Sequence, residues 1–177
     1  MAVGESIFLI GPMGSGKTTV GGALGERLGL DCYDSDDYVE TITGAPIPDL
    51  FKKLGEAGFR DREEMALETL TQASPIILAT GGGAVLRRNN RQRLSDRGTV
   101  IYLSATVATQ LARTQGSSRP LLRTEDPQAR LTALLAERDP LYRATAHHVV
   151  ATDNADTEAA VETIIELTGR APGDTER

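Results

Sequence analysis

The chain has 177 residues, a formal net charge of −6 and no tryptophan. This length suits one domain with a sizeable core, because single domains commonly run to about 100–200 residues. The acidic balance argues against a broad attraction to nucleic acid or to anionic membranes, and no apolar run approaches the roughly 20 residues of a membrane span.

The first predicted element is a buried strand over Ser6–Ile10, and a helix follows over Thr18–Leu28. The residues around the strand lack the basic stretch and the small-residue cleavage site of a signal peptide, so we expect a cytoplasmic protein. Between strand and helix, Gly11–Thr18 reads GPMGSGKT and satisfies G-x-x-x-x-G-K-[ST]. A strand, this loop and a helix in succession are typical of a phosphate-binding P-loop.

The residue types of the P-loop indicate its chemistry. Glycines let backbone N–H groups curve around phosphates at the positive end of the following helix. Lys17 is suited to neutralise the β- and γ-phosphate oxygens, and Thr18 to offer its hydroxyl to Mg²⁺. We expect nucleotide contacts from Gly14, Ser15, Gly16, Lys17, Thr18 and Thr19. A GTPase would add the strings DxxG and NKxD, and neither occurs in the sequence, which disfavours that class.

A second, short strand is predicted near Asp31–Asp34. It holds the single cysteine, Cys32, which has no partner for an intramolecular disulfide and which we expect to be a buried, small apolar residue. The run DSDD begins where this strand ends. Residues two apart on an extended strand point to the same side, so we expect Asp34 and Asp36 to present two carboxylates to one site. One would serve Mg²⁺ through water and the other a substrate hydroxyl. The alternative is that the run caps a helix over Tyr38–Ile42.

The next helix is predicted over Phe59–Gln72 and begins within GFRDREE. Arg60 opens this helix, and Glu63 and Glu64 lie one turn further on, where they can steady its guanidinium. Arginine suits a bidentate grip on a carboxylate or a phosphate. The alternative for Arg60, as for the two later arginines singled out below, is an ordinary solvated surface charge.

A triple glycine follows the third predicted strand, Ile76–Thr80. Gly81, Gly82 and Gly83 should therefore lie at the carboxyl edge of the sheet, in the same crevice as the P-loop. Without a Cβ in the way, a substrate can touch their backbone N–H groups; the alternative is an ordinary flexible turn. The strand has no aspartate at its tip, so the usual second carboxylate for the metal is missing there and DSDD is the candidate to supply it.

The second half of the chain continues the alternation. Strands are predicted over Thr99–Leu103 and His148–Thr152, and helices over Asn89–Arg97, Ala105–Arg113, Gln128–Arg138 and Asp156–Thr168. We expect a solvated helix face from the basic run Arg87, Arg88, Arg91, Arg93 and Arg97. His147 and His148 have no metal-ligand spacing around them, so we assign them no chemistry.

The segment Gln115–Pro127 reads QGSSRPLLRTEDP and is richer in glycine, serine and proline than its neighbours. It predicts a mobile loop between two helices, and long loops of this kind are often functional lids. Arg119 lies in this segment. Arg138 closes the following helix within ERDPLYR, before Pro140.

Strands that alternate with helices indicate parallel strands joined by right-handed crossovers, hence an open α/β sheet covered by helices on both faces. Such sheets bind ligands at the carboxyl ends of their strands. We find no internal repeat, and we expect a single domain over residues 1–170 with a polar tail over 171–177.

The motifs GPMGSGKT, DSDD, GFRDREE, TGGGAV, RPLL and ERDPLYR, in this order and at these intervals, closely resemble the shikimate kinase family over nearly the whole chain. The resemblance implies a three-layer, nucleoside-monophosphate-kinase-like P-loop fold with a five-stranded parallel sheet of order 2-3-1-4-5, a shikimate-binding segment at about 34–62 and a lid at about 113–127. It also implies a monomer that uses ATP and Mg²⁺ to phosphorylate the 3-hydroxyl of shikimate, in the biosynthesis of aromatic amino acids.

The resemblance further implies roles for individual residues on the substrate side. Asp36 binds a shikimate hydroxyl and accepts its proton. Arg60 and Arg138 hold the shikimate carboxylate, and Gly81 and Gly82 contact the substituents of the ring.

On the nucleotide side, the resemblance implies that Asp34 supports Mg²⁺ through water beside Thr18. Arg119 enters from the lid and stabilises charge on the transferring phosphoryl group, Arg113 flanks the adenine, and the adenine loop lies near Asn154.

Two other functions remain open on the sequence. A gluconate or nucleotide kinase of the same architecture shares the P-loop and the lid, and the two arginines alone do not exclude gluconate, although DSDD, GGGAV and RPLL favour shikimate. A non-catalytic ATP sensor is disfavoured by the complete set of lysine, threonine, aspartate and arginine residues. A nucleic-acid partner is disfavoured by the acidic balance.

Overall fold

The structure, a computed structural model, describes residues 5–73, 75–117 and 119–170. Within these residues the strands form one parallel five-stranded sheet of order β2-β3-β1-β4-β5, which confirms the order expected from the sequence motifs. The strands are β1 (Ser6–Ile10), β2 (Cys32–Asp34), β3 (Ile77–Ala79), β4 (Gly98–Ser104) and β5 (His148–Ala151). The expected tail over 171–177 lies outside the described residues.

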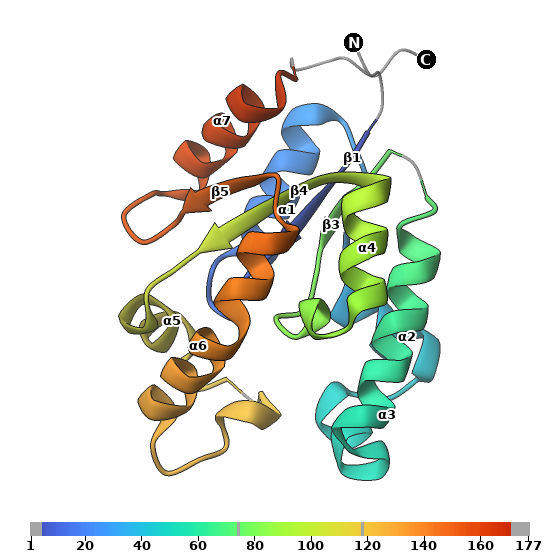
Figure 1. The fold of residues 1–177 in the computed structure, drawn as a ribbon, viewed down its shortest axis with the longest axis vertical. Helices are drawn as coiled ribbons and strands as arrows, with labels where there is room; N and C mark the ends of the chain where they lie inside the picture. Colours follow the sequence, from blue (N-terminus) through green and yellow to red (C-terminus); the bar gives the residue numbers. More distant parts are fainter. Residues whose placement is uncertain (1–4, 74, 118, 171–177) are drawn as a thin grey trace.

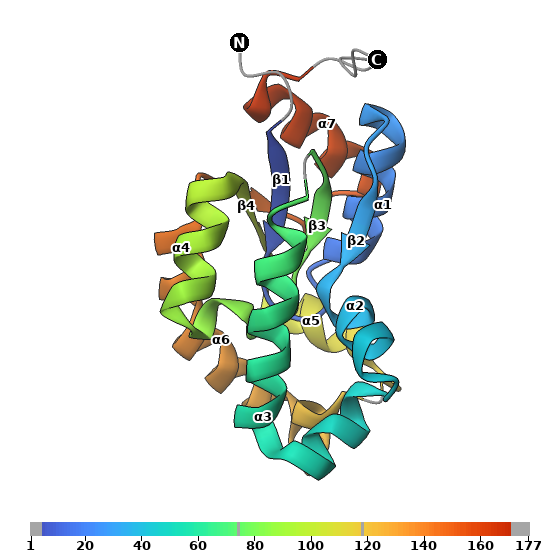
Figure 2. The same cartoon turned by 90° about the vertical axis from the view of Figure 1, so that its right-hand side faces the viewer.

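Helices cover both faces of the sheet (Figure 1). They are α1 (Lys17–Leu28), α2 (Ser35–Thr43), α3 (Ile47–Leu70), α4 (Arg88–Arg97), α5 (Val107–Thr114), α6 (Pro127–Thr145) and α7 (Thr157–Thr168), with short 3₁₀ turns η1 (Ala84–Leu86) and η2 (Pro120–Leu122). Figure 2 shows α1 and α7 on one side of the strands and α4 on the other. No helix in the described ranges is long and apolar enough to cross a membrane.

The central strand β1 explains the three layers, because side chains alternate between the two faces of a strand. Ile7 and Leu9 are fully buried in a cluster with α1 and α7. Phe8 and Ile10 are fully buried in a second cluster, with α3, α4 and α6. Burying one such side chain contributes about 1.5–3 kcal/mol, so a strand that is apolar on both faces belongs in the middle of the sheet.

The carboxyl ends of the strands lead directly into the candidate functional segments (Figure 1). β1 leads into the P-loop, β2 into the acidic run and β3 into the triple glycine. Because all strands are parallel, these three segments meet at one edge of the sheet, where α2, the first half of α3 and η2 also lie (Figures 1 and 2).

Helix α3 begins at Ile47, well before the expected start at Phe59. Pro46 offers no capping side chain, and Glu40 of α2 instead accepts a hydrogen bond from the Ile47 amide at 2.8 Å. A tertiary cap of this kind leaves no local signal in the sequence. Gly55 interrupts the helix with φ 70°, so Arg60 lies inside the second part of α3 and does not open a helix.

Helix α6 continues through Pro140 to Thr145, so the expectation that Arg138 closes it is wrong. A proline inside a helix costs about 3 kcal/mol. Packing on the sheet offsets this cost: the Tyr142 ring stacks on Tyr102 of β4 with ring centroids 4.9 Å apart, and the Tyr102 hydroxyl donates to Asp139 at 2.7 Å.

Two other expectations about exposure are wrong. Cys32 is exposed because β2 is an edge strand of the sheet. The basic run around α4 is not simply a solvated face: Arg87 and Arg93 pair with Glu64 of α3 at 2.8 and 3.2 Å, and Arg97 pairs with Glu68 at 3.1 Å. Their partners are separated from them by about 25 residues of sequence, so the local pattern did not indicate these pairs. Elsewhere, apart from α2, the bounds differ from the expected ones by one or two residues.

Candidate active site

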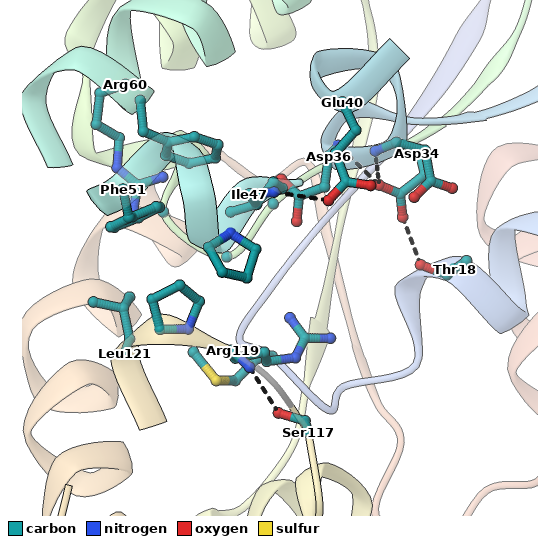
Figure 3. A pocket seen from close by; sticks show the side chains of 18 of the residues that line it. Thr18, Asp34, Asp36, Glu40, Ile47, Phe51, Arg60, Ser117, Arg119 and Leu121 are labelled. Carbon is teal, nitrogen blue, oxygen red and sulfur yellow. Dashed lines mark hydrogen bonds between the residues drawn. The ribbon is translucent and has the colours of Figure 1, made fainter. Parts of the chain in front are cut away.

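A cavity of about 590 Å³ lies at the carboxyl edge of the sheet. Its walls come from the P-loop, from the acidic run with α2 and α3, from the triple glycine, from α6 and from the lid segment. Figure 3 shows labelled side chains of α1, the acidic run, α2, α3 and the lid segment around the same space, with Thr18, Asp34 and Asp36 on one side and Arg119 opposite. The cavity therefore gathers most of the residues that the sequence motifs single out.

The P-loop adopts a conformation that depends on its glycines. Gly14 and Gly16 have φ values of 77° and 93°, in the left-handed region that favours glycine. Lys17 is buried at the start of α1, and its Nζ donates to the carbonyls of Gly11 and Pro12 at 2.7 and 2.8 Å. Burial, followed by the charge of nearby Arg119, lowers the pKa of Lys17 to about 7.

Asp34 is both a helix cap and a neighbour of the P-loop. Its Oδ1 accepts from the amides of Asp36 and Asp37 at 2.8 and 3.3 Å, which caps α2, and its Oδ2 accepts from the Thr18 hydroxyl at 2.7 Å. The acidic run therefore does cap a helix, but the cap is Asp34 and not one of the three residues after it, because the helix begins at Ser35, earlier than expected. The expectation that Asp34 and Asp36 both lie on extended strand and therefore point to the same side is wrong, because Asp36 belongs to the first turn of α2.

Asp36 nevertheless lines the cavity beside Asp34 (Figure 3). Burial, then the charges of Glu63 and Asp34, raises the pKa of Asp36 from its ordinary 3.8 to about 7. The carboxylate also touches the triple glycine: a Cβ on Gly81 would lie 2.7 Å from Asp36 Oδ1. A larger residue at this position would therefore require the carboxylate to move.

Arg60 and Arg138 line the cavity and are only 7% and 4% exposed, so the alternative of solvated surface charges is wrong for both. Arg60 pairs with the fully buried Glu63 and, at 3.3 Å, with Glu56. Glu64 does not pair with Arg60, because its carboxylate pairs with Arg87 and Arg93 instead. Burial raises the pKa of Glu63 against the opposing charge of Arg60.

The triple glycine is held from both sides and is not a flexible turn. The Gly81 amide donates to Ser35 Oγ at 3.0 Å, and the Gly82 carbonyl accepts from the Tyr142 hydroxyl at 2.5 Å. A Cβ on Gly83 would lie 2.2 Å from the Arg60 guanidinium. Sequence reasoning found the glycines but missed Ser35 and Tyr142, whose only sequence signal is their place within the motifs DSDD and ERDPLYR.

The lid segment closes one side of the cavity. Arg119 is exposed to solvent, lines the cavity and is near enough to affect the pKa values of Lys17 and Asp36 (Figure 3). Its neighbours Leu121 and Leu122 pack against a buried cluster of Met13, Leu131 and Leu134. The lid is therefore attached to the P-loop by apolar packing through Met13.

Arg113 joins α5 to the P-loop and to the end of β5. Its guanidinium donates to the Gly14 carbonyl at 3.1 Å and to the Thr152 carbonyl at 2.7 Å. Asn154 is exposed two residues further on, next to Asp153, which accepts from the Thr106 amide at 2.8 Å. The expected adenine-side residues thus lie behind the P-loop, outside the cavity described above.

The oxygen atoms of Thr18 and Asp34 are the kind of ligand that Mg²⁺ prefers. In the described part of the chain, no group of three or more histidine, cysteine, aspartate or glutamate side chains could hold a metal ion. A metal at this site would take its remaining ligands from water and from phosphate oxygens, as is usual for Mg²⁺.

Comparisons with known proteins agree on one family. The model of the family "Shikimate kinase" matches residues 13–168. The shikimate kinase of Photobacterium profundum is 48% identical over 168 residues, which cover 94% of this chain and 96% of that protein. The shikimate kinase of Methylococcus capsulatus is 51% identical over 162 residues, which cover 91% and 90%.

Among solved structures, the shikimate kinase from Acinetobacter baumannii in complex with shikimate has a TM-score of 0.91 and 47% identity, with coverage of 93% of this chain and 92% of that one. A sugar kinase from Janibacter has a TM-score of 0.56 at 16% identity, and this likeness concerns the fold alone.

Proposed function

This chain belongs to the shikimate kinase family, and from that premise we infer that it transfers the terminal phosphoryl group of ATP to the 3-hydroxyl of shikimate. The products are shikimate 3-phosphate and ADP, and the reaction serves the biosynthesis of aromatic amino acids. The observation that carries the inference is one cavity that joins the P-loop to a carboxylate and two buried arginines. These groups complement a carboxylated polyol, whose carboxylate needs cations and whose hydroxyls need acceptors.

We assign the shikimate carboxylate to the guanidinium groups of Arg60 and Arg138. Both line the cavity and both are buried, so an anion there is attracted in a medium that screens charge less than water does. The backbone of Gly81 and Gly82 is assigned to the ring substituents. The Gly81 amide is already used by Ser35, so the Gly82 amide is the donor of the pair that we assign to the substrate.

The nucleotide phosphates are assigned to the P-loop residues Gly14, Ser15, Gly16, Lys17, Thr18 and Thr19. Mg²⁺ is assigned to the Thr18 hydroxyl and, through water, to Asp34, whose 2.7 Å hydrogen bond places two hard oxygen donors together. When bound, Mg²⁺ would neutralise negative charge on the β- and γ-phosphate oxygens. Arg113 and Asn154 are assigned to the adenine.

Asp36 is the proton acceptor in this proposal. Its pKa of about 7 suits a general base, because catalysis by a base is most efficient when its pKa lies near the working pH. Phosphoryl transfer has a loose transition state, so neutralisation of charge by Lys17 and Arg119 contributes more to the rate than the strength of the base.

We also propose that the enzyme is a cytoplasmic monomer, with a substrate-binding segment at about 34–62 and a lid at about 113–127. The apolar packing of the lid on Met13 supports this division, because it attaches a segment that carries a catalytic arginine to the nucleotide loop. Light scattering of the purified protein measures the oligomeric state directly.

The test is an ADP-release assay with ATP and Mg²⁺ in which shikimate, quinate, gluconate and a nucleoside monophosphate are offered separately. We expect strong turnover with shikimate alone. Turnover with gluconate or with a nucleotide instead would show another small-metabolite kinase of the same fold. Nucleotide binding without turnover on any acceptor would indicate a non-catalytic ATP sensor.

A further inference from the structure

Tyr142 lies one helical turn beyond Arg138 on α6, and none of the roles assigned above uses it. The side chain is only 1% exposed, yet it carries a polar hydroxyl. That hydroxyl donates to the Gly82 carbonyl at 2.5 Å, and a Cβ on Gly82 would lie 3.7 Å from Arg138 Nη1. The Tyr142 hydroxyl therefore holds the glycine turn directly beside an arginine of the cavity.

The ring of Tyr142 is fixed from the opposite direction. It stacks on Tyr102 of strand β4, which pairs with the central strand β1, with ring centroids 4.9 Å apart and an angle of 29° between the rings. The Tyr102 hydroxyl donates to Asp139 of α6 at 2.7 Å, and Asp139 also accepts from Arg143 at 2.7 Å. The stacked rings thus give the hydroxyl of Tyr142 a rigid support, which is the condition for it to hold another group in place.

Arg138 needs such a partner. Its guanidinium is buried, and its Nε has no hydrogen-bond partner among the described residues. Pro140 removes one backbone hydrogen bond from α6 two residues later, so the helix itself holds this region less firmly. A buried guanidinium with few partners can rotate unless a neighbouring group fixes its plane.

We propose that Tyr142 is a positioning residue for substrate binding: its hydroxyl fixes the Gly82 carbonyl beside the Arg138 guanidinium and so keeps that guanidinium in the orientation that receives a carboxylate. The proposal rests on the proposed function, because it concerns the site assigned to the shikimate carboxylate. Tyr142 does not touch the reacting groups in this account. It acts through Arg138, and loss of its hydroxyl should change substrate affinity more than nucleotide affinity.

The variant Tyr142→Phe tests this, because it keeps the ring and its stacking and removes only the hydroxyl. By isothermal titration we expect the affinity for shikimate to fall by up to about tenfold, the upper end of what one neutral hydrogen bond contributes. The affinity for a non-hydrolysable ATP analogue should stay within twofold of wild type. The matched control is Tyr102→Phe, which removes the other hydroxyl of the same stacked pair but leaves Gly82 and Arg138 untouched; we expect it to keep the wild-type affinity for shikimate.

A double-mutant cycle separates positioning from general packing. If Tyr142 acts through Arg138, then Tyr142→Phe should change shikimate affinity less than twofold when Arg138→Ala is already present. Additive effects of the two substitutions would overturn the proposal. Affinities are compared below the unfolding transitions of all variants, which circular dichroism locates, so a lower melting temperature of Tyr142→Phe does not affect the comparison.

Two further outcomes are distinguishable. Equal shikimate affinity of wild type and Tyr142→Phe would overturn the positioning role and leave the proposed function intact. Failure of the wild-type enzyme to bind shikimate at all would overturn both.

Discussion

Asp36 and Lys17 are two ionisable side chains that the fold holds at pKa values of about 7, reached from opposite directions. Burial disfavours the charged form of each, so it raises the pKa of the carboxyl and lowers that of the ammonium. Such a site is costly to the free protein and useful to the enzyme, because bound phosphates and a substrate hydroxyl supply the partners that the empty site lacks.

The variant Asp36→Asn tests the role of the carboxylate in catalysis. Asparagine keeps the size of the side chain but does not accept a proton, so we expect kcat to fall by about 10²–10⁴. The measurement is steady-state ADP release with saturating ATP and shikimate. Asp49→Asn, an exposed position on the same segment, is the control and should keep wild-type turnover. Near-normal turnover of a folded Asp36→Asn enzyme would contradict the assignment.

We also expect the Asp36→Asn substitution to change how the free energy of unfolding depends on pH. The native carboxyl of Asp36 keeps its proton up to about pH 7, whereas the unfolded carboxyl loses it near its ordinary 3.8. Its contribution to the free energy of unfolding therefore falls as the pH rises through this window and stays low above it. We expect Asp36→Asn to be more stable than wild type at pH 8, on the order of 2 kcal/mol, with a smaller difference at pH 4.

Chemical denaturation without nucleotide at the two pH values measures this difference. The difference between variant and wild type belongs to the coupled pair, because the Asp36 charge raises the pKa of Lys17 and the Lys17 charge lowers the pKa of Asp36. The lowered pKa of Lys17 makes its own contribution to stability rise between about 7 and its ordinary 10.5. A variant no more stable than wild type at pH 8 would show that burial does not strain Asp36.

At the scale of elements, the sequence predicted every strand and the approximate place of the helices other than the first part of α3 and the two 3₁₀ turns, because apolar runs and glycine or proline boundaries are local signals. The sequence-based prediction failed where a residue distant in the sequence determines where a helix begins or ends. Helix α3 starts early because Glu40 of another helix caps it, and α6 passes Pro140 because Tyr142 packs on the sheet. It also treated Arg60 and Arg138 as separate charges, since burial of an arginine depends on which elements surround it.

The ion pairs between α3 and α4 are another such case, and they allow a test at Glu64. This carboxylate accepts from Arg87, Asn89 and Arg93, and these hydrogen bonds lower its pKa to about 2. We expect Glu64→Gln to lower the free energy of unfolding by about 1–2 kcal/mol at pH 7, a modest value because the network is partly exposed to solvent.

Because the pKa of Glu64 is lowered, its contribution to stability is complete above its ordinary 4.5 and is lost as the pH falls toward about 2. Urea denaturation at pH 7 and at pH 3 should therefore show a smaller difference between variant and wild type at the lower pH. Glu26→Gln, on the exposed face of α1, is the control and should change stability little at either pH. An equal loss at both pH values would point to packing as the cause.

Across the whole molecule, the cavity has two halves that different elements build. Thr18 and Asp34 form the nucleotide half, from α1 and the end of β2. Arg60 and Arg138 form the other half, from α3 and α6, on the opposite side of the triple glycine. Motifs in the sequence identified both halves, but only the fold shows that Ser35 and Tyr142 join each of them to the glycine turn between them.

This division predicts how the enzyme responds to removal of divalent ions. With EDTA present, we expect ADP release to stop, because the phosphates lose the cation that we assign to Thr18 and Asp34. Shikimate should still stabilise the protein, because neither arginine depends on that cation. At 100 times its dissociation constant, shikimate adds about 2.7 kcal/mol to the free energy of unfolding, which for a chain of this size raises the melting temperature by about 5–11 °C.

A thermal melt with and without shikimate, repeated in EDTA and in Mg²⁺, measures both effects on one sample. The control is Arg130→Ala, an exposed arginine on α6 outside the cavity, which should melt with the same shikimate shift as wild type. If EDTA abolished the shikimate shift, the two halves would not be independent. The site would then depend on the metal for its shape as well as for its chemistry, and the assignment of the carboxylate to the arginine pair alone would be wrong.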